Sequence, residues 1–471
     1  MEPLYKIKKG LDIMLEGAAE QQLAACPLAE TYAVKPADFN GIVPKLAVKE
    51  GSSVKAGDPL FVDKATEKIA VVSPVSGTVK AIERGERRKL LRICIESDGK
   101  QDYKSFNAPD PEFSCKRVQS SSLVLPSTAE NLQKASGEEV HALMLEAGMA
   151  AFLRQRPYDV IADPEQKPKS IFVSAFSTMP LAADFSFVAK GREGDFKTGI
   201  AALSRIAPVY VGINPQQINS ELLPITHAKV SVFSGPNPAG NVGVQINHID
   251  PVNKGETVWI MGAEHVIMLG ELFRTGKVNL TRRIAVAGSM ITAPTYVETL
   301  IGAPMTSIIG DKIKGTGHVR IIGGNPLVGE RSGMDDYLGA FCTEVCAIPE
   351  GDDVNEAFGW IMPRLNQFST SRSYFSWLFG KSKKYDLDCR IKGGERHIIM
   401  SGEYDRVFPM DIYAGYLIKA IITGDIDRQE ALGIYEVAPE DFAVAEFVDS
   451  SKLELQKIVR EGLDLLRKEN A

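Results

Sequence analysis

The spacing of the apolar residues changes along the chain, and this change constrains the fold more than any other sequence feature. Short apolar runs separated by Gly, Pro and Asp fill residues 34–97, strand-like and helix-like runs alternate over 170–288, and helical spacing dominates after residue 354. One hydrophobic core rarely organises a chain of 471 residues. We therefore expect a multidomain protein of mixed α/β and α+β type, with about three or four domains.

Composition and charge exclude several classes of protein. The chain is 44% apolar and 24% charged, as ordinary globular proteins are. Its net charge of −6 gives no electrostatic reason to expect a nucleic acid as partner. Six cysteines are too few for a disulfide scaffold, and neither a signal peptide nor an apolar run of about 18–20 residues is present. These features predict a cytoplasmic chain that does not itself span a membrane.

Three short motifs characterise the first hundred residues: 48–51 (VKEG), 54–58 (VKAGD) and 73–79 (SPVSGTV). They resemble the biotinyl/lipoyl carrier domains, which implies a flattened β-sandwich over residues 1–100 with an N-terminal extension. Carriers bear their cofactor on a lysine in an exposed hairpin, here Lys64 or Lys68. Neither lysine has the carrier spacing to Pro74, so neither is centred on a symmetric two-residue turn. We predict that both are unmodified.

Strands and helices are expected to alternate in the second domain. Residues 101–135 are polar and rich in turn formers, which predicts a linker. Ser136 and Glu139 then have the spacing of a helix capping box. The β-branched runs that follow are separated by segments long enough for helical crossovers, which predicts a Rossmann-like parallel sheet over 136–280. These runs are 171–175, 209–213, 230–233 and 258–261.

Two further domains complete the predicted fold. Residues 281–335 contain short strands around one helix-like piece, with turns at Gly302, Gly315 and Gly324, which favours a small β-grasp module of the soluble-ligand-binding type. The run 284–287 fits either this module or the preceding sheet. Residues 336–471 are predicted to form a C-terminal helical domain because the apolar residues around 417–422 and 453–466 have helical spacing.

Residues that could form a reaction centre are sparse. Cys342 and Cys346 have no third or fourth cysteine nearby to complete an iron–sulfur site, and no two histidines have a zinc-binding spacing. No P-loop or G-x-G-x-x-G follows a predicted strand. The loop 235–243 (GPNPAGNVG) contains two prolines, which favours a structural turn over a phosphate cradle. We predict no catalytic residue, no cofactor-binding residue and no metal ligand in this chain.

Several segments, in order along the chain, resemble a single family. They are 7–12 (IKKGLD), 60–64 (LFVDK), 73–77 (SPVSG), 84–88 (RGERR), 153–158 (LRQRPY), 238–249 (PAGNVGVQINHI), 323–327 (GGNPL) and 402–411 (GEYDRVFPMD). Their collinearity makes the chain similar to the A subunits of Na⁺-translocating NADH:quinone oxidoreductases. This family is related to the flavin-binding subunit of complex I and to the C subunit of the Rnf complex.

The resemblance implies a peripheral, cofactor-free subunit on the cytoplasmic side of the cell membrane. Its complex pumps Na⁺ while electrons pass from NADH to a quinone, so catalysis belongs to the complex. The resemblance implies docking on the membrane-embedded B subunit, with quinone as a candidate ligand. FMN, FAD, riboflavin and Fe–S groups are expected in other subunits.

One departure from the flavin-binding relatives supports the absence of a flavin, and one departure from the family itself puts in doubt the role of a cysteine near the end of the chain. Flavin-binding relatives have a Gly-rich loop where this chain has 148–157 (GMAAFLRQRP), whose bulky side chains prevent close backbone approach to FMN. Residues 449–452 (DSSK) stand where the family resemblance leads us to expect a Cys-containing stretch. Two alternatives remain, namely a lipoyl- or biotin-carrier enzyme and an FMN-dependent NADH dehydrogenase. A covalent mass increase would identify the first, and a yellow colour the second.

Aromatic and basic residues are interleaved in residues 368–384, which we call the aromatic–basic segment. Such a mixture suits either a protein interface or an anionic membrane surface. Packing of the aromatic rings into the core of the helical domain is the competing interpretation. The candidate docking residues are Tyr374, Phe375, Trp377, Phe379, Lys381, Lys383 and Lys384.

Overall fold

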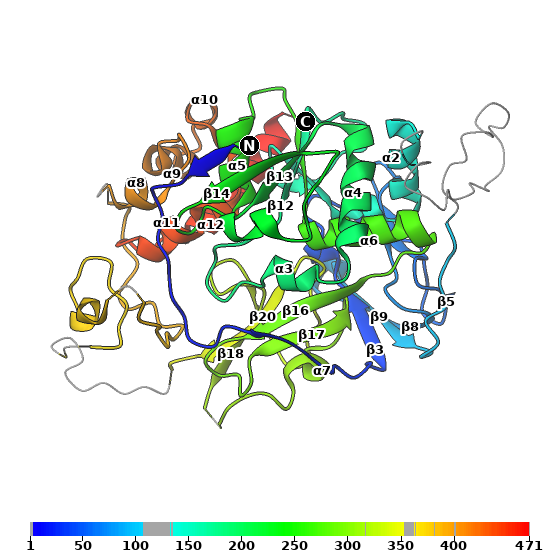
Figure 1. The fold of residues 1–471 in the computed structure, drawn as a ribbon, viewed down its shortest axis with the longest axis horizontal. Coiled ribbons are helices and arrows are strands. Elements are labelled where there is room, and N and C mark those ends of the chain that lie inside the picture. The colour runs from blue at the N-terminus through cyan, green and yellow to red at the C-terminus, as the bar shows by residue number, and fades with distance from the viewer. Residues whose placement is uncertain are drawn as a thin grey trace.

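The computed structural model describes residues 3–106, 132, 135–315, 317–352, 362, 364–380, 382–399 and 402–470. Within these residues the strands form four sheets of seven, six, four and three strands. Figure 1 shows the seven-stranded sheet in the upper half of the molecule, the six-stranded sheet below it, the strands of residues 31–97 on the right and the C-terminal helices on the left. The predicted mixture of sheets and helices is therefore present.

The N-terminal part is built from two small antiparallel sheets that pack around Leu60, Phe61, Ile93 and Ile95, all fully buried. Gly77 of the SPVSG motif lies so close to the neighbouring strand that a Cβ would be 1.9 Å from the Glu96 carbonyl oxygen, which explains the glycine. The four-stranded sheet has the order β3 (Thr31–Val34), β9 (Leu90–Ser97), β8 (Gly77–Arg84), β5 (Ser53–Val54), and the three-stranded sheet β4 (Pro44–Leu46), β6 (Pro59–Asp63), β7 (Ala70–Val72).

The seven-stranded sheet contains the strands predicted in the second domain. Its order is β1 (Leu4–Lys6), β14 (Lys229–Ser234), β13 (Val209–Ile213), β12 (Ser170–Ser174), β15 (Val258–Met261), β10 (Leu153–Arg156), β11 (Val160–Ile161). β1 and β12 to β15 are parallel, whereas β10 and β11 are antiparallel to their neighbours.

Helices cover the faces of this sheet. They are α2 (Gly137–Glu146), α3 (Phe185–Val188), α4 (Glu193–Ile206), α5 (Val242–Ile249) and α6 (Ala263–Thr275). The predicted capping box of α2 is confirmed. Ser136 Oγ accepts a hydrogen bond from the Glu139 amide at 3.2 Å, and the Ser136 amide donates to Glu139 Oε2 at 2.8 Å.

The six-stranded sheet includes residues whose assignment the sequence left open. Its order is β19 (Glu330–Ser332), β18 (Val319–Gly323), β20 (Glu344–Pro349), β16 (Thr281–Ala287), β17 (Thr295–Leu300), β2 (Glu20–Ala24), with α7 (Met305–Ile309) beside it. The run 284–287 lies in β16 and thus belongs to this sheet. β20 lies within the predicted helical region 336–471, so that prediction is wrong at its start. Val345, Cys346 and Ala347 form a fully buried run that completes the sheet.

The C-terminal helices form a second hydrophobic core. They are α8 (Glu403–Val407), α9 (Ala414–Ile422), α10 (Ile426–Ala431), α11 (Ala443–Val448) and α12 (Leu455–Glu469). Their core also contains Ile7 and Phe233 of the seven-stranded sheet region. In the described residues between 364 and 399 the helical structure is one 3₁₀ turn, η6 (Phe375–Phe379), so the helical part starts near Glu403 rather than at residue 336.

The N-terminal segment connects the two large sheets. β1 pairs with β14 of the seven-stranded sheet, and β2 pairs with β17 of the six-stranded sheet. Between them Leu15 bridges to Tyr385. Figure 1 shows this dark blue segment descending past the C-terminal helices to the lower sheet. The predicted N-terminal extension thus lies outside the two small sheets.

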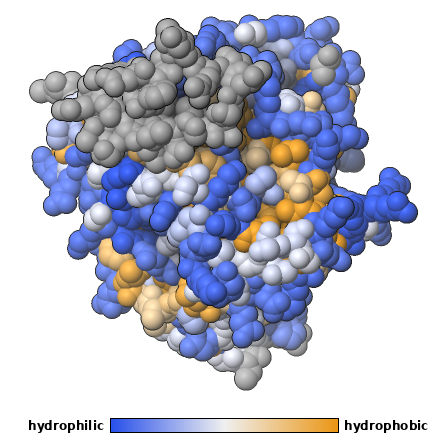
Figure 2. Space-filling model, turned by 90° about the vertical axis from the view of Figure 1, so that its right-hand side faces the viewer, coloured by the Kyte–Doolittle hydropathy of each residue, from blue (hydrophilic) through white to orange (hydrophobic). Residues whose placement is uncertain are grey.

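Hydrophilic and hydrophobic residues are unevenly distributed over the surface. Figure 2 shows a mainly hydrophilic face with separate hydrophobic areas. No helix of the described residues is long and apolar enough to cross a bilayer.

Candidate functional site

The carboxyl edge of the seven-stranded sheet is the first place to look for a ligand. In open α/β sheets, ligands bind beyond the carboxyl ends of the strands, where the strand order reverses. The order β14, β13, β12, β15 places that point between β12 and β15. Residues of the same chain close this edge at three positions.

The first closure lies at the start of α6, directly after β15. Glu264 Oε2 accepts from Arg282 Nε at 2.9 Å, and Glu264 Oε1 accepts from the Arg283 amide at 2.8 Å. Arg282 is fully buried and donates through Nη1 to the Ala340 carbonyl at 2.7 Å. A helix N-terminus that would suit a phosphate is therefore packed against the six-stranded sheet.

The second closure is the loop after β12, which also binds the six-stranded sheet. The Asp184 amide donates to the Tyr296 hydroxyl at 2.7 Å. Asn325, within the GGNPL segment, donates through Nδ2 to the Pro180 carbonyl at 2.6 Å and is 1% exposed. The loop is held by neighbouring protein groups at the place where a cofactor would need free backbone amides.

The third closure lies at the start of α5 and involves the C-terminal part. Asp441 lies so close to Gly243 that a Cβ there would be 2.4 Å from Asp441 Oδ1. Asn241, the residue before α5, donates through Nδ2 to the Glu440 carbonyl at 3.1 Å. A side-chain carboxylate of the chain thus occupies the end of the helix that follows the loop 235–243, which supports the predicted structural role of this loop.

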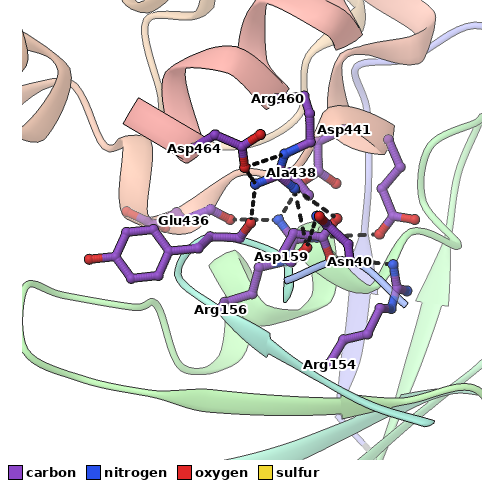
Figure 3. A network of polar contacts seen from close by, with 11 residues as sticks. Asn40, Arg154, Arg156, Asp159, Glu436, Ala438, Asp441, Arg460 and Asp464 are labelled. Carbon is purple, nitrogen blue, oxygen red and sulfur yellow. Dashed lines mark hydrogen bonds and ion pairs between the residues drawn. The ribbon is translucent and has the colours of Figure 1, made fainter. Parts of the chain in front are cut away.

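Asp441 also belongs to a buried ion-pair network, drawn in Figure 3. Arg156 at the end of β10 is fully buried and donates to Asp441 Oδ2 at 3.0 Å, while its Nη2 lies 3.3 Å from Glu440 Oε1. Burial raises the pKa of Glu440, against the opposing charges of Arg154 and Arg156. The network joins the antiparallel edge of the seven-stranded sheet to the C-terminal helices.

Asp159 forms the second centre of the network. Its carboxylate accepts from Arg154 Nη1 at 3.3 Å, and Arg460 of α12 donates to the Asp159 carbonyl at 3.2 Å. Although burial raises the pKa of Asp159, the charges of Arg154, Arg156 and Arg460 outweigh it and lower the pKa. Sequence reasoning did not find this network because its partners are up to 302 residues apart, as in the bond from Arg460 to the Tyr158 carbonyl. The only signal was the inclusion of Arg156 in the LRQRPY segment.

Burial keeps three potential redox groups or metal ligands, the side chains of Cys342, Cys346 and His265, uncharged near neutral pH. Burial raises the pKa of the Cys342 thiol to about 11 and raises the pKa of the Cys346 thiol well above its usual value, so neither is a thiolate near neutral pH. Burial lowers the pKa of His265 to about 3, with a contribution from the charge of Arg282. His265 stacks on Phe152 with ring centroids 4.5 Å apart. In the described part of the chain no three His, Cys, Asp or Glu side chains are grouped to hold a metal ion.

The β6–β7 hairpin carries the two lysines that a carrier domain would modify. Lys64 lies in the turn after β6, and Lys68 forms a surface ion pair with Glu165 of the adjoining domain; both lysines are exposed. Gly148 packs so closely on this hairpin that a Cβ would be 2.5 Å from Val72 Cγ1. The hairpin therefore packs against the rest of the molecule rather than projecting as a free arm.

The aromatic–basic segment exposes its apolar side chains. Phe375, Trp377 and Phe379 are 54%, 45% and 55% exposed, and Leu378 is 63% exposed. Core packing of these rings is therefore wrong as an interpretation. Tyr374, another predicted docking residue, is half-buried.

The basic residues lie beside these rings. Lys383 Nζ is 4.4 Å from the centroid of Phe379, Arg372 lies over Trp377, and Lys384 is exposed. Lys381 lies outside the described residues. The structure thus brings the described candidate residues together in one segment at the surface, while their role in docking stays a prediction.

Comparison with known proteins gives the family context. Three family profiles match: "NqrA N-terminal barrel-sandwich hybrid domain" over residues 5–98, "NqrA second alpha/beta domain" over 135–278 and "NQRA C-terminal domain" over 283–333. These descriptions agree with the mixed architecture above.

Curated relatives align with the chain from end to end. The proteins from Neisseria meningitidis serogroup B and Yersinia pestis bv. Antiqua are each 34% identical over 469 residues, which is 99% of this chain and 100% of theirs. The protein from Haemophilus influenzae is 34% identical over 472 residues, with the same coverage. All three are named as the A subunit of a Na(+)-translocating NADH-quinone reductase. The alignment with a solved structure of a NAD⁺-reducing NiFe hydrogenase covers 72% of this chain and 68% of the hydrogenase chain, at 10% identity and a TM-score of 0.37. This similarity is too low to support a conclusion.

Proposed function

The chain belongs to the family of A subunits of Na⁺-translocating NADH-quinone reductases, and from this membership we propose how it works within that complex. It is a subunit of an enzyme that transfers electrons from NADH to a quinone and translocates Na⁺. The observation that carries this conclusion is the end-to-end match at 34% identity. The enzyme is the complex, and we propose that the isolated chain is not catalytic.

We propose that the subunit is peripheral and lies on the cytoplasmic side. The absence of a membrane-spanning helix among the described residues fits a peripheral position. The five cysteines of the described part are free thiols, in keeping with a reducing compartment. Protease added to inverted membrane vesicles should cleave the subunit, and protease added to intact cells should not.

The membrane-embedded B subunit is the proposed main partner, and the aromatic–basic segment is the proposed surface that holds the chain at the membrane beside this partner. Four adjacent exposed apolar side chains support this assignment, because such patches commonly mark interaction sites. Replacing both Trp377 and Phe379 with Ala should leave the isolated chain folded, as circular dichroism would show, and abolish its co-purification with the membrane subunits. Normal co-purification of the folded variant would remove the segment from the interface.

We propose that this chain holds no flavin, iron–sulfur cluster or nicotinamide nucleotide, and that those groups belong to other subunits. Support comes from the three closures of the sheet edge, where Glu264, the loop after β12 and Asp441 occupy the positions that a nucleotide phosphate would need. The pattern suggests a redox fold retained as a scaffold.

More specific fold assignments are also proposals. The strand order β14, β13, β12, β15 with helical crossovers supports a Rossmann-like domain. The two small antiparallel sheets support a biotinyl/lipoyl-like sandwich within residues 1–100. The sheet of β16 to β20 with α7 supports a β-grasp module that begins near residue 281 and extends beyond the predicted end at 335 to include β20. We keep the helical assignment for the C-terminal part from Glu403 onward.

A quinone is the proposed small-molecule ligand. A cavity of about 510 Å³ beside β1 and β14 has a mainly apolar lining that includes Tyr5, Leu223 and Ile225. Lys229 Nζ and the Tyr210 hydroxyl, 3.3 Å apart, offer hydrogen-bond donors at its edge. Equilibrium dialysis of a short-chain quinone should show binding that Ala228→Trp, which fills the cavity, removes. Unchanged binding in that variant would exclude this cavity.

A test of the whole proposal compares the complex with and without this chain. Membranes that lack it should lose Na⁺-stimulated quinone reduction, and adding the purified chain back should restore the activity. Full activity in its absence would show that the subunit is dispensable for the reaction.

A further inference from the structure

We propose that the aromatic–basic segment binds an anionic lipid surface, with its exposed rings in the headgroup region and its basic side chains at the lipid phosphates. The inference rests on the proposed function, because it names what a peripheral subunit touches beside its protein partners. Three observations carry it: the anchoring of the segment, its charge, and the place of its lysines.

The exposed rings are presented by an anchored turn. Ser376 is 1% exposed within η6, whereas its neighbours Phe375 and Trp377 face outward. At the base of the segment, the Phe368 ring contacts the rings of Tyr385 and Phe447 at centroid distances of 5.3 and 5.6 Å. A turn held in this way keeps four large apolar side chains in water, which is unfavourable unless another surface covers them.

The charge of the segment is opposite to that of the chain. Residues 368–384 contain four basic residues and no acidic residue, in a protein of net charge −6. In the described part of the chain, Arg372, Lys383 and Lys384 form no ion pair with a carboxylate. Lys383 instead donates to the Asn366 side chain at 3.0 Å and lies over the Phe379 ring. These charges are therefore available to an anionic partner.

The lysines favour a lipid surface over a protein interface. Lysine is depleted in protein interfaces, while aromatic residues and arginine are enriched there. Rings with adjacent lysines are typical of segments that lie in the headgroup region, where the rings stay at the interface and the ammonium groups meet phosphates. The contact of Lys383 with Phe379 places such a pair on this turn.

Co-sedimentation of the full-length chain with vesicles tests the proposal. The chain should bind vesicles of phosphatidylglycerol and phosphatidylcholine, should not bind phosphatidylcholine alone, and should dissociate at high salt. The variant with Arg372→Gln and Lys384→Gln should bind about 25-fold more weakly, since each basic residue contributes a factor of about five. Trp377→Ala with Phe379→Ala should also weaken binding.

Matched controls separate the segment from the rest of the surface. Lys89→Gln with Lys100→Gln makes the same change of net charge on the N-terminal part, where both lysines are exposed. Tyr413→Ala with Tyr416→Ala removes two rings that are 69% and 60% exposed at α9. Both control variants should bind vesicles like the unaltered protein. Equal loss in either control would overturn the assignment to this segment.

Tryptophan fluorescence gives a second readout. Insertion should shift the emission of Trp377 to shorter wavelength when anionic vesicles are added, and Trp377→Phe should remove the shift while vesicle binding persists. The other described tryptophan, Trp259, is 1% exposed. A shift that persists in Trp377→Phe would show that Trp377 is not the inserting residue.

Failure of this inference can be distinguished from failure of the proposed function. If the chain co-purifies with the other subunits but does not bind anionic vesicles, the segment docks on protein and the lipid proposal is wrong. If it binds vesicles but never co-purifies with the other subunits, the proposed function fails and the lipid site stands. If the variant with Trp377→Ala and Phe379→Ala unfolds, the vesicle binding of the variant with Arg372→Gln and Lys384→Gln still tests whether the segment binds anionic lipid.

Discussion

His265 is the residue whose protonation the folded chain most clearly opposes. It is 3% exposed, stacks on Phe152, and accordingly has a pKa of about 3, against about 6.5 in an unfolded chain. The unfolded state therefore binds more protons between pH 6.5 and pH 3, so stability falls as the pH is lowered through this range. From pH 7 to pH 5 this residue alone should reduce the free energy of unfolding by about 2 kcal/mol.

Urea unfolding at pH 7 and pH 5 measures that loss. His265→Gln keeps a donor for the Ala340 carbonyl, which His265 Nε2 contacts at 3.1 Å, and has no group that titrates in this range. The variant should lose about 2 kcal/mol less than the unaltered chain between the two pH values. Equal losses would show that His265 does not control the acid side of the stability curve.

Arg156 is the residue on which the attachment of the C-terminal helices most depends. Replacing it with Met leaves the buried carboxylate of Asp441, and the partly exposed carboxylate of Glu440, without their guanidinium, which should cost about 3–5 kcal/mol. Adding Asp441→Asn should recover part of this loss, because the amide carries no charge. Urea unfolding gives the free energies, and limited proteolysis should show earlier cleavage near residues 402–470 in the single variant. A single variant as stable as the unaltered chain would contradict this role.

At the scale of elements, the β6–β7 hairpin decides whether the N-terminal part carries a cofactor. Its packing on Gly148 and the ion pair between Lys68 and Glu165 oppose presentation of a lysine to a modifying ligase. We expect peptide mass spectrometry of protein from its native host to find Lys64 and Lys68 unmodified. A lipoyl or biotinyl adduct on either lysine would refute the prediction and revive the carrier hypothesis.

The elements that could be predicted from the sequence are those with a local signal. β13 and β15 have the predicted bounds because their β-branched runs are buried on both faces, and α2 begins at its capping box. β1 and β2 had no such signal, since each is short and exists through pairing with a distant strand. The buried run of β20 lacked the alternation that distinguishes a strand from a helix segment.

The site was predictable only in part, for related reasons. Composition identified the aromatic–basic segment, but a pattern of rings and lysines does not reveal which side chains face solvent. In the structure, the burial of Ser376 and the packing of Phe368 on Phe447 determine which side chains of the segment are exposed. The contacts that close the sheet edge join residues such as Asn325 and Pro180, which are 145 positions apart, so no local pattern could predict them.

At the scale of the whole molecule, the closed sheet edge predicts the behaviour of the purified chain. It should contain no flavin, iron or nicotinamide nucleotide and should not oxidise NADH, because its own side chains occupy the helix ends and loops that bind such groups. Absorbance spectra, metal analysis and an NADH oxidation assay measure these properties, with the complete complex as positive control. Flavin absorbance in proportion to protein would contradict the prediction.

The N-terminal segment has a consequence for the order in which the molecule is assembled. The ribosome releases this segment before its partner strands, because Leu4 pairs with Val232 and Leu23 lies opposite Tyr296. Both partner strands are synthesised more than 200 residues later, so neither pairing can form until that part of the chain has been made. The two strand pairings that connect the sheets through this segment are therefore late steps of assembly. A bulky tag fused ahead of β1 would hinder this late step, whereas a tag behind α12 would leave it unaffected.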